Sequence, residues 1–152
     1  MTIKIAVIGC GNMSWPIIKR IHVTYPEIEF HTYTPSKTKS LALSKEVDGV
    51  HHDDLSSFEK MNYWFIACKP QQLEQFAIDI GSKIHGEKVI SILAATKFAK
   101  LEKEFNTSQS LLFIHVLQMY LTNGYIQKDE LTCLQKSTKK DLEIYQYLLE
   151  IS

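Results

Sequence analysis

The sequence lacks a net charge and any long hydrophobic run. Its 17 lysines and arginines balance 17 aspartates and glutamates, so the formal net charge of the 152 residues is zero. Nucleic acids and anionic membranes bind basic surfaces, so we expect neither as the main partner. No apolar run approaches the roughly 20 residues that a membrane span requires. These absences leave one compact domain, long enough to bury a core, as the expectation.

Cysteine is also scarce. Cys10, Cys68 and Cys133 are far apart, odd in number and include no CxxC pair. This spacing argues against a disulfide scaffold and a zinc site, and it is typical of thiols kept reduced. The first nine residues are too short for a secretory signal and lead straight into a glycine-rich turn. We therefore expect a cytoplasmic protein.

Apolar runs and helical patterns alternate along the chain. Strands are expected at 3–8, 28–33, 63–68, 88–93 and 111–117, with a short segment near Val50 and an edge strand at 124–128. Helices are expected from the glycine-rich turn through Ile21, from a cap at Ser36 through Val47, weakly over 55–61, and over 71–84, 98–105 and 141–151. This alternation predicts an α/β fold, with right-handed βαβ units in a Rossmann-type, doubly wound, mostly parallel sheet covered by helices on both faces.

The turn after the first strand reads Gly9-x-Gly11-x-x-Ser14 and leads into a helix. This arrangement is typical of dinucleotide-binding folds. Gly9 allows the sharp turn, Gly11 lets the backbone approach a pyrophosphate, and Ser14 is small enough for close packing. Free N–H groups at the helix start would face the phosphates. A turn needed only for packing is the alternative, and we favour nucleotide binding because the turn opens a βαβ unit.

The end of the second strand indicates which nucleotide binds. NAD-binding proteins usually place Asp or Glu there to accept hydrogen bonds from the adenine-ribose 2′-OH. Here the sequence reads HTYTPSKTK, with no acid until Glu46. Thr34 and Ser36 offer hydroxyls, and Lys37 and Lys39 offer positive charges that could hold a 2′-phosphate. A solvated, lysine-bearing helix start is the alternative, and we favour NADP, which binds in its reduced form as NADPH.

Three segments resemble the N-terminal half of pyrroline-5-carboxylate reductase: IGCGNMS at 8–14, IACKPQQL at 66–73 and VISILAAT at 89–96. That family makes proline from a cyclic imine by hydride transfer from NADPH or, less readily, NADH. Related β-hydroxyacid and cofactor-F420-linked dehydrogenases share the glycines but usually not both Asn-Met and Lys-Pro-Gln. The resemblance covers residues 3 to about 96 well and the rest weakly.

The resemblance implies three groups of cofactor-binding residues. The turn from Gly9 to Ser14, which includes Asn12 and Met13, would hold the pyrophosphate, and Ser36 and Lys37 would meet the 2′-phosphate. The nicotinamide-ribose end would be lined by Ala67, Cys68, Lys69 and Pro70. Open α/β sheets bind ligands at the carboxyl ends of their strands, which supports this last group. For Lys69 an ordinary solvated lysine is the alternative, and Asp54 stands where the family tends to have an asparagine on the adenine ribose.

The resemblance fails in two places. The family's Arg-x-Met-Pro-Asn-Thr-Pro segment corresponds to IHVLQMYLTNG at 114–124, and no proline occurs after Pro70. The chain also ends at Ser152, about where the family's helical substrate and dimerisation domain begins. We therefore expect residues 1–152 to be a single NAD(P)-binding Rossmann domain, incomplete as a catalyst on its own and able to self-associate through the helix around 145–149. The alternative is a non-catalytic nucleotide-binding module that acts as a sensor or partner subunit.

Other candidate sites are weaker, and the catalytic residues stay unassigned. The HHDD segment at 51–54 could suggest a metal site, but adjacent ligands rarely close one, so we expect a solvated turn. His115, inside an apolar strand, is expected to be a hydrogen-bonded core or crevice residue rather than an acid–base catalyst. Cys10 is expected to be a small residue that fits its turn. The sequence contains no legible Ser–His–Asp set, Cys–His set or pair of catalytic carboxylates.

Overall fold

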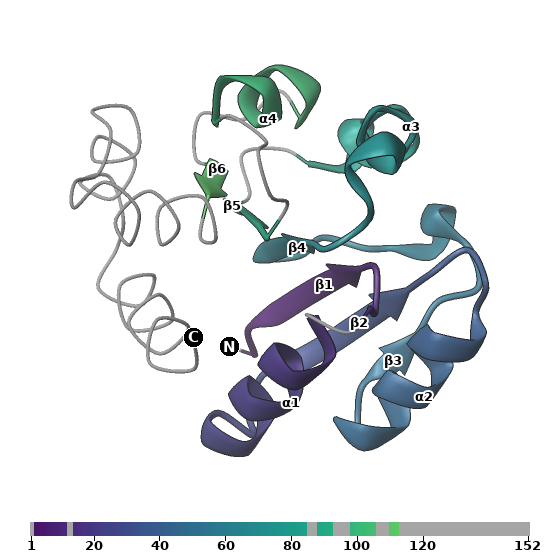
Figure 1. Ribbon diagram of the computed structural model, residues 1–152. Coiled ribbons are helices and arrows are strands. Elements are labelled where there is room, and N and C mark those ends of the chain that lie inside the picture. The colour runs from purple at the N-terminus through teal and green to yellow at the C-terminus, as the bar shows by residue number, and fades with distance from the viewer. Residues whose placement is uncertain (1, 12–13, 85–87, 93–97, 106–109, 113–152) are drawn as a thin grey trace.

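A six-stranded sheet in the order β3-β2-β1-β4-β5-β6 organises the chain, and every neighbouring pair of strands is parallel (Figure 1). The computed structural model describes residues 2–11, 14–84, 88–92, 98–105 and 110–112. The strands are β1 (Lys4–Ile8), β2 (Glu29–Tyr33), β3 (Val50–His51), β4 (Tyr63–Ile66), β5 (Lys88–Ser91) and β6 (Ser110–Leu112). The predicted parallel sheet is confirmed, and its strand order reverses between β1 and β4, beside the turn at Gly9.

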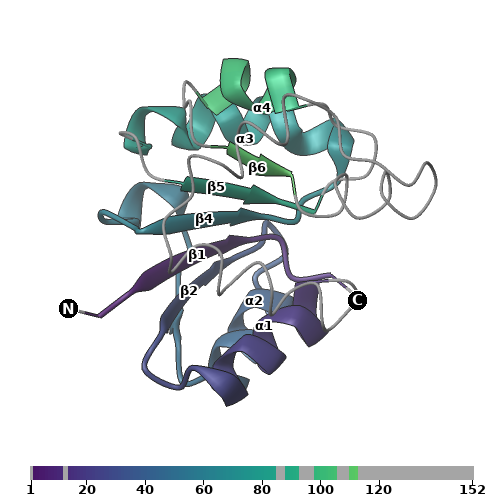
Figure 2. The ribbon, with the colours of Figure 1, turned by 90° about the vertical axis from the view of Figure 1, so that its left-hand side faces the viewer.

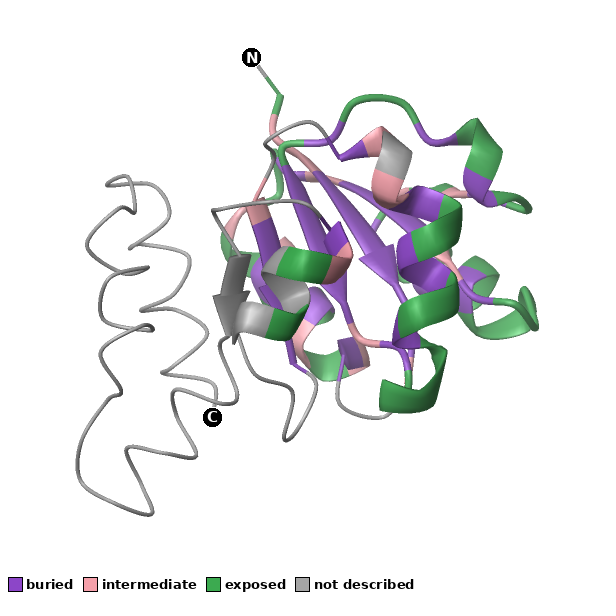
Figure 3. Cartoon of the chain, turned by 90° about the horizontal axis from the view of Figure 1, so that it is seen from above, coloured by how far each residue is buried: buried purple, intermediate pink, exposed green. Residues whose placement is uncertain are grey.

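Helices cover both faces of this sheet, as predicted. Helices α1 (Ser14–Thr24) and α2 (Thr38–Glu46) lie on one face, and α3 (Leu73–Ile80) and α4 (Phe98–Phe105) lie on the other (Figures 1 and 2). Alternate residues of β1 therefore enter two separate cores: Val7 packs with α1 and α2, and Ala6 packs with α3. The central strands are buried along their length, which explains their continuous apolar sequence (Figure 3). Among the described residues, no helix is long and apolar enough to cross a membrane.

Several local predictions are corrected. The helix expected over 55–61 is a single 3-10 turn, η1 (Leu55–Ser57), because the Asp54 side chain caps it and Phe58 is already extended. The helix expected over 71–84 shortens to α3, between the 3-10 turns η2 (Pro70–Gln72) and η3 (Gly81–Lys83). Ser36 does not cap α2, whose preceding residue is Lys37, and no described side chain caps this helix. The elements expected at 113–117, 124–128 and 141–151, with His115, lie outside the described residues.

Gly9 joins the ends of three strands. Its backbone N–H donates to the Tyr33 carbonyl at the end of β2, with the two atoms 3.0 Å apart. Its φ is +97°, and a Cβ atom there would lie 2.6 Å from the carbonyl carbon and oxygen of Ala67, which follows β4. Only glycine accommodates both the positive φ and this close approach. Gly9 therefore lets β1, β2 and β4 converge where the strand order reverses.

Two buried imidazoles fasten β3 and its following turn to β2. The His31 Nδ1 and His52 Nε2 atoms are 2.7 Å apart, and both rings are nearly inaccessible to solvent. The outer nitrogens of the pair bond Glu29 and the Ser57 hydroxyl, and the His52 ring stacks on Phe58 with 4.1 Å between centroids. His52 is therefore not part of a solvated turn, which corrects that expectation. Among the described residues, no group of three or more potential ligands could hold a metal ion.

Replacing Gly9 by alanine is expected to lower the free energy of unfolding by about 2–4 kcal/mol, from backbone strain and the contact with Ala67. Gly11→Ala is the matched control, because among the residues with a described position only its chain neighbours come within 4 Å of the place its Cβ would take. Urea unfolding of both variants measures the difference. Equal stability of the two variants would contradict the role assigned to Gly9.

The protein is expected to lose stability as the pH falls below about 6.5 through His52. Burial, and then the charges of His31 and His51, lower the pKa of His52 from its ordinary value of 6.5, while Glu59 opposes this shift. The unfolded chain therefore takes up a proton in acid that the folded protein resists. Between pH 7 and pH 5, the free energy of unfolding measured with denaturant should fall less steeply in His52→Gln than in the wild type. Identical pH dependences would contradict the prediction.

Candidate functional site

The predicted site residues come from three segments that leave the carboxyl edge of the sheet: 9–14 after β1, 34–37 after β2 and 67–70 after β4. The Ala67 backbone N–H donates to the Ile8 carbonyl at 2.8 Å, which joins the third segment to the end of β1. Gly9 joins the first segment to the end of β2 through Tyr33. All three segments therefore meet where the strand order reverses, the position at which open parallel sheets bind ligands.

The Ser14 side chain stabilises the glycine-rich turn on the side that faces the protein. The buried Ser14 hydroxyl lies 3.1 Å from the Gly9 carbonyl and 3.3 Å from the Gly11 carbonyl, and it donates to this pair of acceptors. The outer side is open to the part of the chain that the structure describes, because none of those residues, chain neighbours aside, has an atom within 4 Å of a Cβ built on Gly11. Asn12 and Met13 lie outside the described residues. The shape fits a phosphate group that approaches the Gly11 backbone in front of α1.

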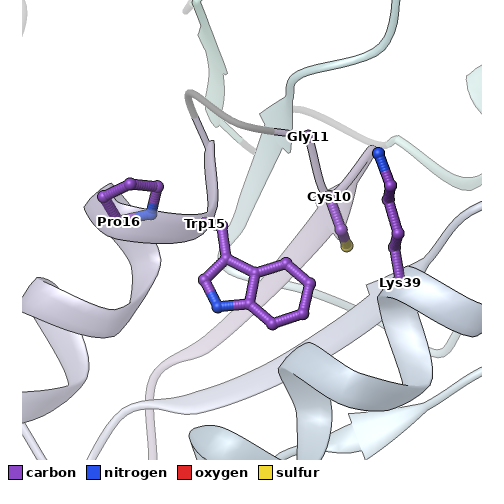
Figure 4. Close-up of a pocket in the computed structure, with 5 residues that line it drawn as sticks. All are labelled: Cys10, Gly11, Trp15, Pro16 and Lys39. Atoms are coloured by element: carbon purple, nitrogen blue, oxygen red, sulfur yellow. The ribbon is translucent and has the colours of Figure 1, made fainter.

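A cavity of about 320 Å³ opens beside this turn (Figure 4). It is lined by Cys10, Gly11, Trp15, Pro16 and Lys39. The Lys39 side chain extends from the first turn of α2 toward the Cys10–Gly11 backbone, and the Trp15 indole lies between the helices (Figure 4). A lysine that faces the start of α1 creates a positive environment, which favours a phosphate. None of the described residues that line the cavity is acidic.

Cys10 is a buried wall of this cavity rather than a reactive group. Burial raises the pKa of its thiol to about 12, although the nearby charge of Lys39 acts in the opposite direction. The thiol is therefore protonated at neutral pH, and a protonated thiol is a poor nucleophile.

The residues predicted to bind the cofactor at the end of β2 differ in their burial and in their bonding partners. Thr34 is buried, and its hydroxyl donates to the Ser40 Oγ at 3.0 Å, so it is used inside the fold. Ser36 is exposed. The Lys37 Nζ lies 3.6 Å from an Asp53 carboxylate oxygen, and Lys37 has a φ of 62° just before α2. The structure therefore brings Lys39, and not Lys37, to the cavity.

The predicted residues after β4 follow the strand that neighbours β1 at the carboxyl edge of the sheet. Cys68 is buried, which raises the pKa of its thiol to about 11. Lys69 and Pro70 are exposed, and the strand expected to reach Cys68 ends at Ile66. The Lys69 backbone N–H donates to the Gln72 side-chain oxygen at 3.2 Å, which closes the turn η2. This segment presents a lysine beside the point where β1 and β4 separate.

The turn after β3 carries two acidic groups that are already engaged. One Asp54 carboxylate oxygen accepts the Ser56 N–H at 2.6 Å. Hydrogen bonding by the Ser56 side chain and then its backbone, with the charges of Lys37 and Lys83, holds the pKa of Asp54 below its usual range. The pKa of Asp53 is also lowered, by a hydrogen bond to His51 and by the charge of Lys37. A phosphate near Lys37 would meet these carboxylates, so the cavity at Lys39 is the more favourable place for it.

The sequence matches a known protein family over most of the described residues. Residues 4–95 match the family described as NADP oxidoreductase, coenzyme F420-dependent. No curated protein matches the chain. The matched range includes the turn at Gly9, the end of β2 and the segment after β4.

Solved structures share the fold at low sequence identity. A pyrroline-5-carboxylate reductase from Coxiella burnetii superimposes with a TM-score of 0.59 at 18% identity, covering 72% of this chain and 42% of that one. The corresponding enzyme from Streptococcus pyogenes gives 0.51 at 20% identity, covering 71% and 39%. A lactate dehydrogenase from Cryptosporidium parvum gives 0.61 at 13% identity, covering 80% and 47%. The chain spans between 35% and 47% of the length of such structures.

The family match implies binding of NAD or NADP, in agreement with the open turn at the reversal of the strand order. The resemblance to pyrroline-5-carboxylate reductase noted in the sequence is confirmed for this domain. The chain belongs to the NADP oxidoreductase, coenzyme F420-dependent family, the NADP-binding domain that forms the N-terminal part of pyrroline-5-carboxylate reductases.

Proposed function

We propose that the chain binds NADP(H) in the crevice between the glycine-rich turn, the end of β2 and the end of β4. The observation that carries this proposal is the cavity in which Lys39 faces the open side of Gly11. The cavity fits a phosphate because it combines exposed backbone at a helix start with a nearby cation and has no acidic lining residue among those described. When bound, NADPH supplies a hydride.

Each segment of the crevice has a distinct part in this proposal. The turn from Gly9 to Ser14, with Asn12 and Met13, holds the pyrophosphate against the start of α1. Lys39 holds the 2′-phosphate, and the exposed residues Ser36 and Lys37 form the rim beside it. The buried Thr34 supports the start of α2 through Ser40. The nicotinamide-ribose end lies against Ala67, Cys68, Lys69 and Pro70.

The preference for NADP over NAD rests on charge. An acid at the end of β2 would accept hydrogen bonds from a free 2′-OH and repel a 2′-phosphate. The stretch from Thr34 to Lys45 contains no acid, and the two carboxylates after β3 are occupied by a turn and by Lys37. Lys39 therefore meets a phosphate without a competing carboxylate in the cavity.

NADPH is expected to bind about tenfold to a hundredfold more tightly than NADH, the effect of one or two charge-assisted hydrogen bonds to the 2′-phosphate. Lys39→Ala is expected to remove most of this preference. Lys37→Ala is the matched control and should remove less of it, because the Lys37 ammonium is already paired with Asp53. Fluorescence titration of the wild type and both variants with each cofactor measures the six dissociation constants. Equal affinities of the wild type for NADPH and NADH would contradict the proposal.

We propose further that the domain serves hydride transfer to a cyclic imine, as in pyrroline-5-carboxylate reductase, but is incomplete as a catalyst on its own. Hydride transfer requires the imine carbon within about 3–3.5 Å of the nicotinamide, and this positioning supplies much of the rate. In this proposal Ala67 to Pro70, which follow β4, lie on one side of the nicotinamide. A second element must cover the other side and orient the substrate.

Residues 1–152 alone are therefore expected to bind NADPH but to reduce pyrroline-5-carboxylate far below the usual enzyme range of roughly 1–1000 per second. The assay follows NADPH oxidation with the imine, using protein whose mass confirms its length. Turnover within that range would show that no further covering element is needed.

A nucleotide-binding sensor or partner subunit is the second candidate. It is favoured by the segment at 114–124, which lacks both prolines of the Arg-x-Met-Pro-Asn-Thr-Pro pattern of pyrroline-5-carboxylate reductase. Tight NADPH binding without imine reduction, in the presence of a helical domain from a pyrroline-5-carboxylate reductase, would favour this second candidate.

A further inference from the structure

We infer that Trp15 is a ligand-contacting wall for the 2′-phosphorylated adenosine half of the dinucleotide, and that Glu46 is the positioning residue that holds it in place. The inference rests on the proposed function, because it concerns the same cavity. It assigns a binding role to a carboxylate at the far end of α2, 31 residues from the indole that it holds.

Trp15 stands between the protein core and the cavity. It is the second residue of α1, and its side chain packs against the core cluster formed by α1, α2 and the sheet. The same residue lines the cavity with Gly11 and Lys39 (Figure 4). The position of the indole therefore sets how much room lies between the glycine-rich turn and the lysine.

Glu46 fixes that position. The indole Nε1–H donates to the Glu46 Oε2 at 2.8 Å, and the Lys19 Nζ lies 3.1 Å from the same oxygen. These two hydrogen bonds lower the pKa of Glu46, the one from Trp15 contributing most, so the carboxylate is ionised at neutral pH. One oxygen thus links two side chains of α1 to the last residue of α2.

Lys39 and Glu46 act from the same side of α2. They are seven residues apart, which places them on one face of the helix, two turns from each other. This face is turned toward α1, because Glu46 bonds Trp15 and Lys19, and Lys39 reaches the cavity beside Trp15. Glu46 therefore orients the wall that faces the cation. The indole N–H is used by Glu46, which leaves the apolar ring surface of Trp15 for the adenosine half.

The test uses 2′,5′-ADP as the probe and compares Glu46→Ala with the conservative Glu46→Gln. Loss of the hydrogen bond in Glu46→Ala is expected to weaken 2′,5′-ADP binding about tenfold to a hundredfold, the effect of one hydrogen bond to a charged group. Glu46→Gln retains an oxygen that accepts the indole N–H, so it should restore affinity to within about threefold. In a Trp15→Phe background, which lacks the donor, Glu46→Ala should add no further loss.

A spectroscopic readout separates positioning from general stability. Acrylamide quenching of Trp15 should fall when 2′,5′-ADP binds to the wild type, whereas the fully buried Trp64 contributes a constant background. Quenching should rise in unliganded Glu46→Ala, and circular dichroism confirms that each variant is folded. The inference would be overturned if Glu46→Ala and the wild type bound 2′,5′-ADP with the same affinity, or if acrylamide quenching did not change when 2′,5′-ADP binds. Either result would leave the proposed function intact. A wild type that binds neither 2′,5′-ADP nor NADPH would overturn both.

Discussion

The backbone of Gly9 approaches the backbone of Ala67 and Cys68 so closely that no side chain fits between them. This contact sets where β1 and β4 separate, and the hydrogen bond from Gly9 to Tyr33 adds the end of β2 to the same place. The three segments of the proposed site therefore meet at the carboxyl edge of the sheet, beside the cavity lined by Gly11 and Lys39. Ser14 then holds the turn from inside, which leaves the Gly11 backbone open to a ligand.

The local backbone around the start of α2 determines which lysine lines the cavity. Lys37 lies just before α2 in the left-handed region and pairs with Asp53 after β3, whereas Lys39 is on the first turn of the helix and lines the cavity. The carboxylates after β3 are thereby kept out of the cavity and are partly neutralised. Trp15 and Glu46 connect this cavity to the packing of α1 on α2. Core packing and the binding site are therefore parts of one structure.

Much of the fold was predictable because its signals are local. The continuous apolar run at 63–66 indicates a strand buried on both faces, and the glycine spacing indicates the turn beside the reversal of the strand order. That Lys39, and not Lys37, lines the cavity was not predictable, since it depends on the residue at which α2 begins. The burial of His52 and the bond from Trp15 to Glu46 depend on partners 21 and 31 residues away, which no local pattern identifies.

The central claim is that the open backbone at Gly11 accepts the pyrophosphate of NADP(H). Its most direct test is a calorimetric titration of NADPH against the wild type and Gly11→Ala, with the stability of both measured in parallel. The account predicts unchanged stability, because a Cβ at Gly11 would meet no atom of the described residues within 4 Å, apart from its chain neighbours. It also predicts at least about tenfold weaker binding, because the methyl group would occupy the space of the phosphate. Equal NADPH affinity in the two proteins would contradict the account.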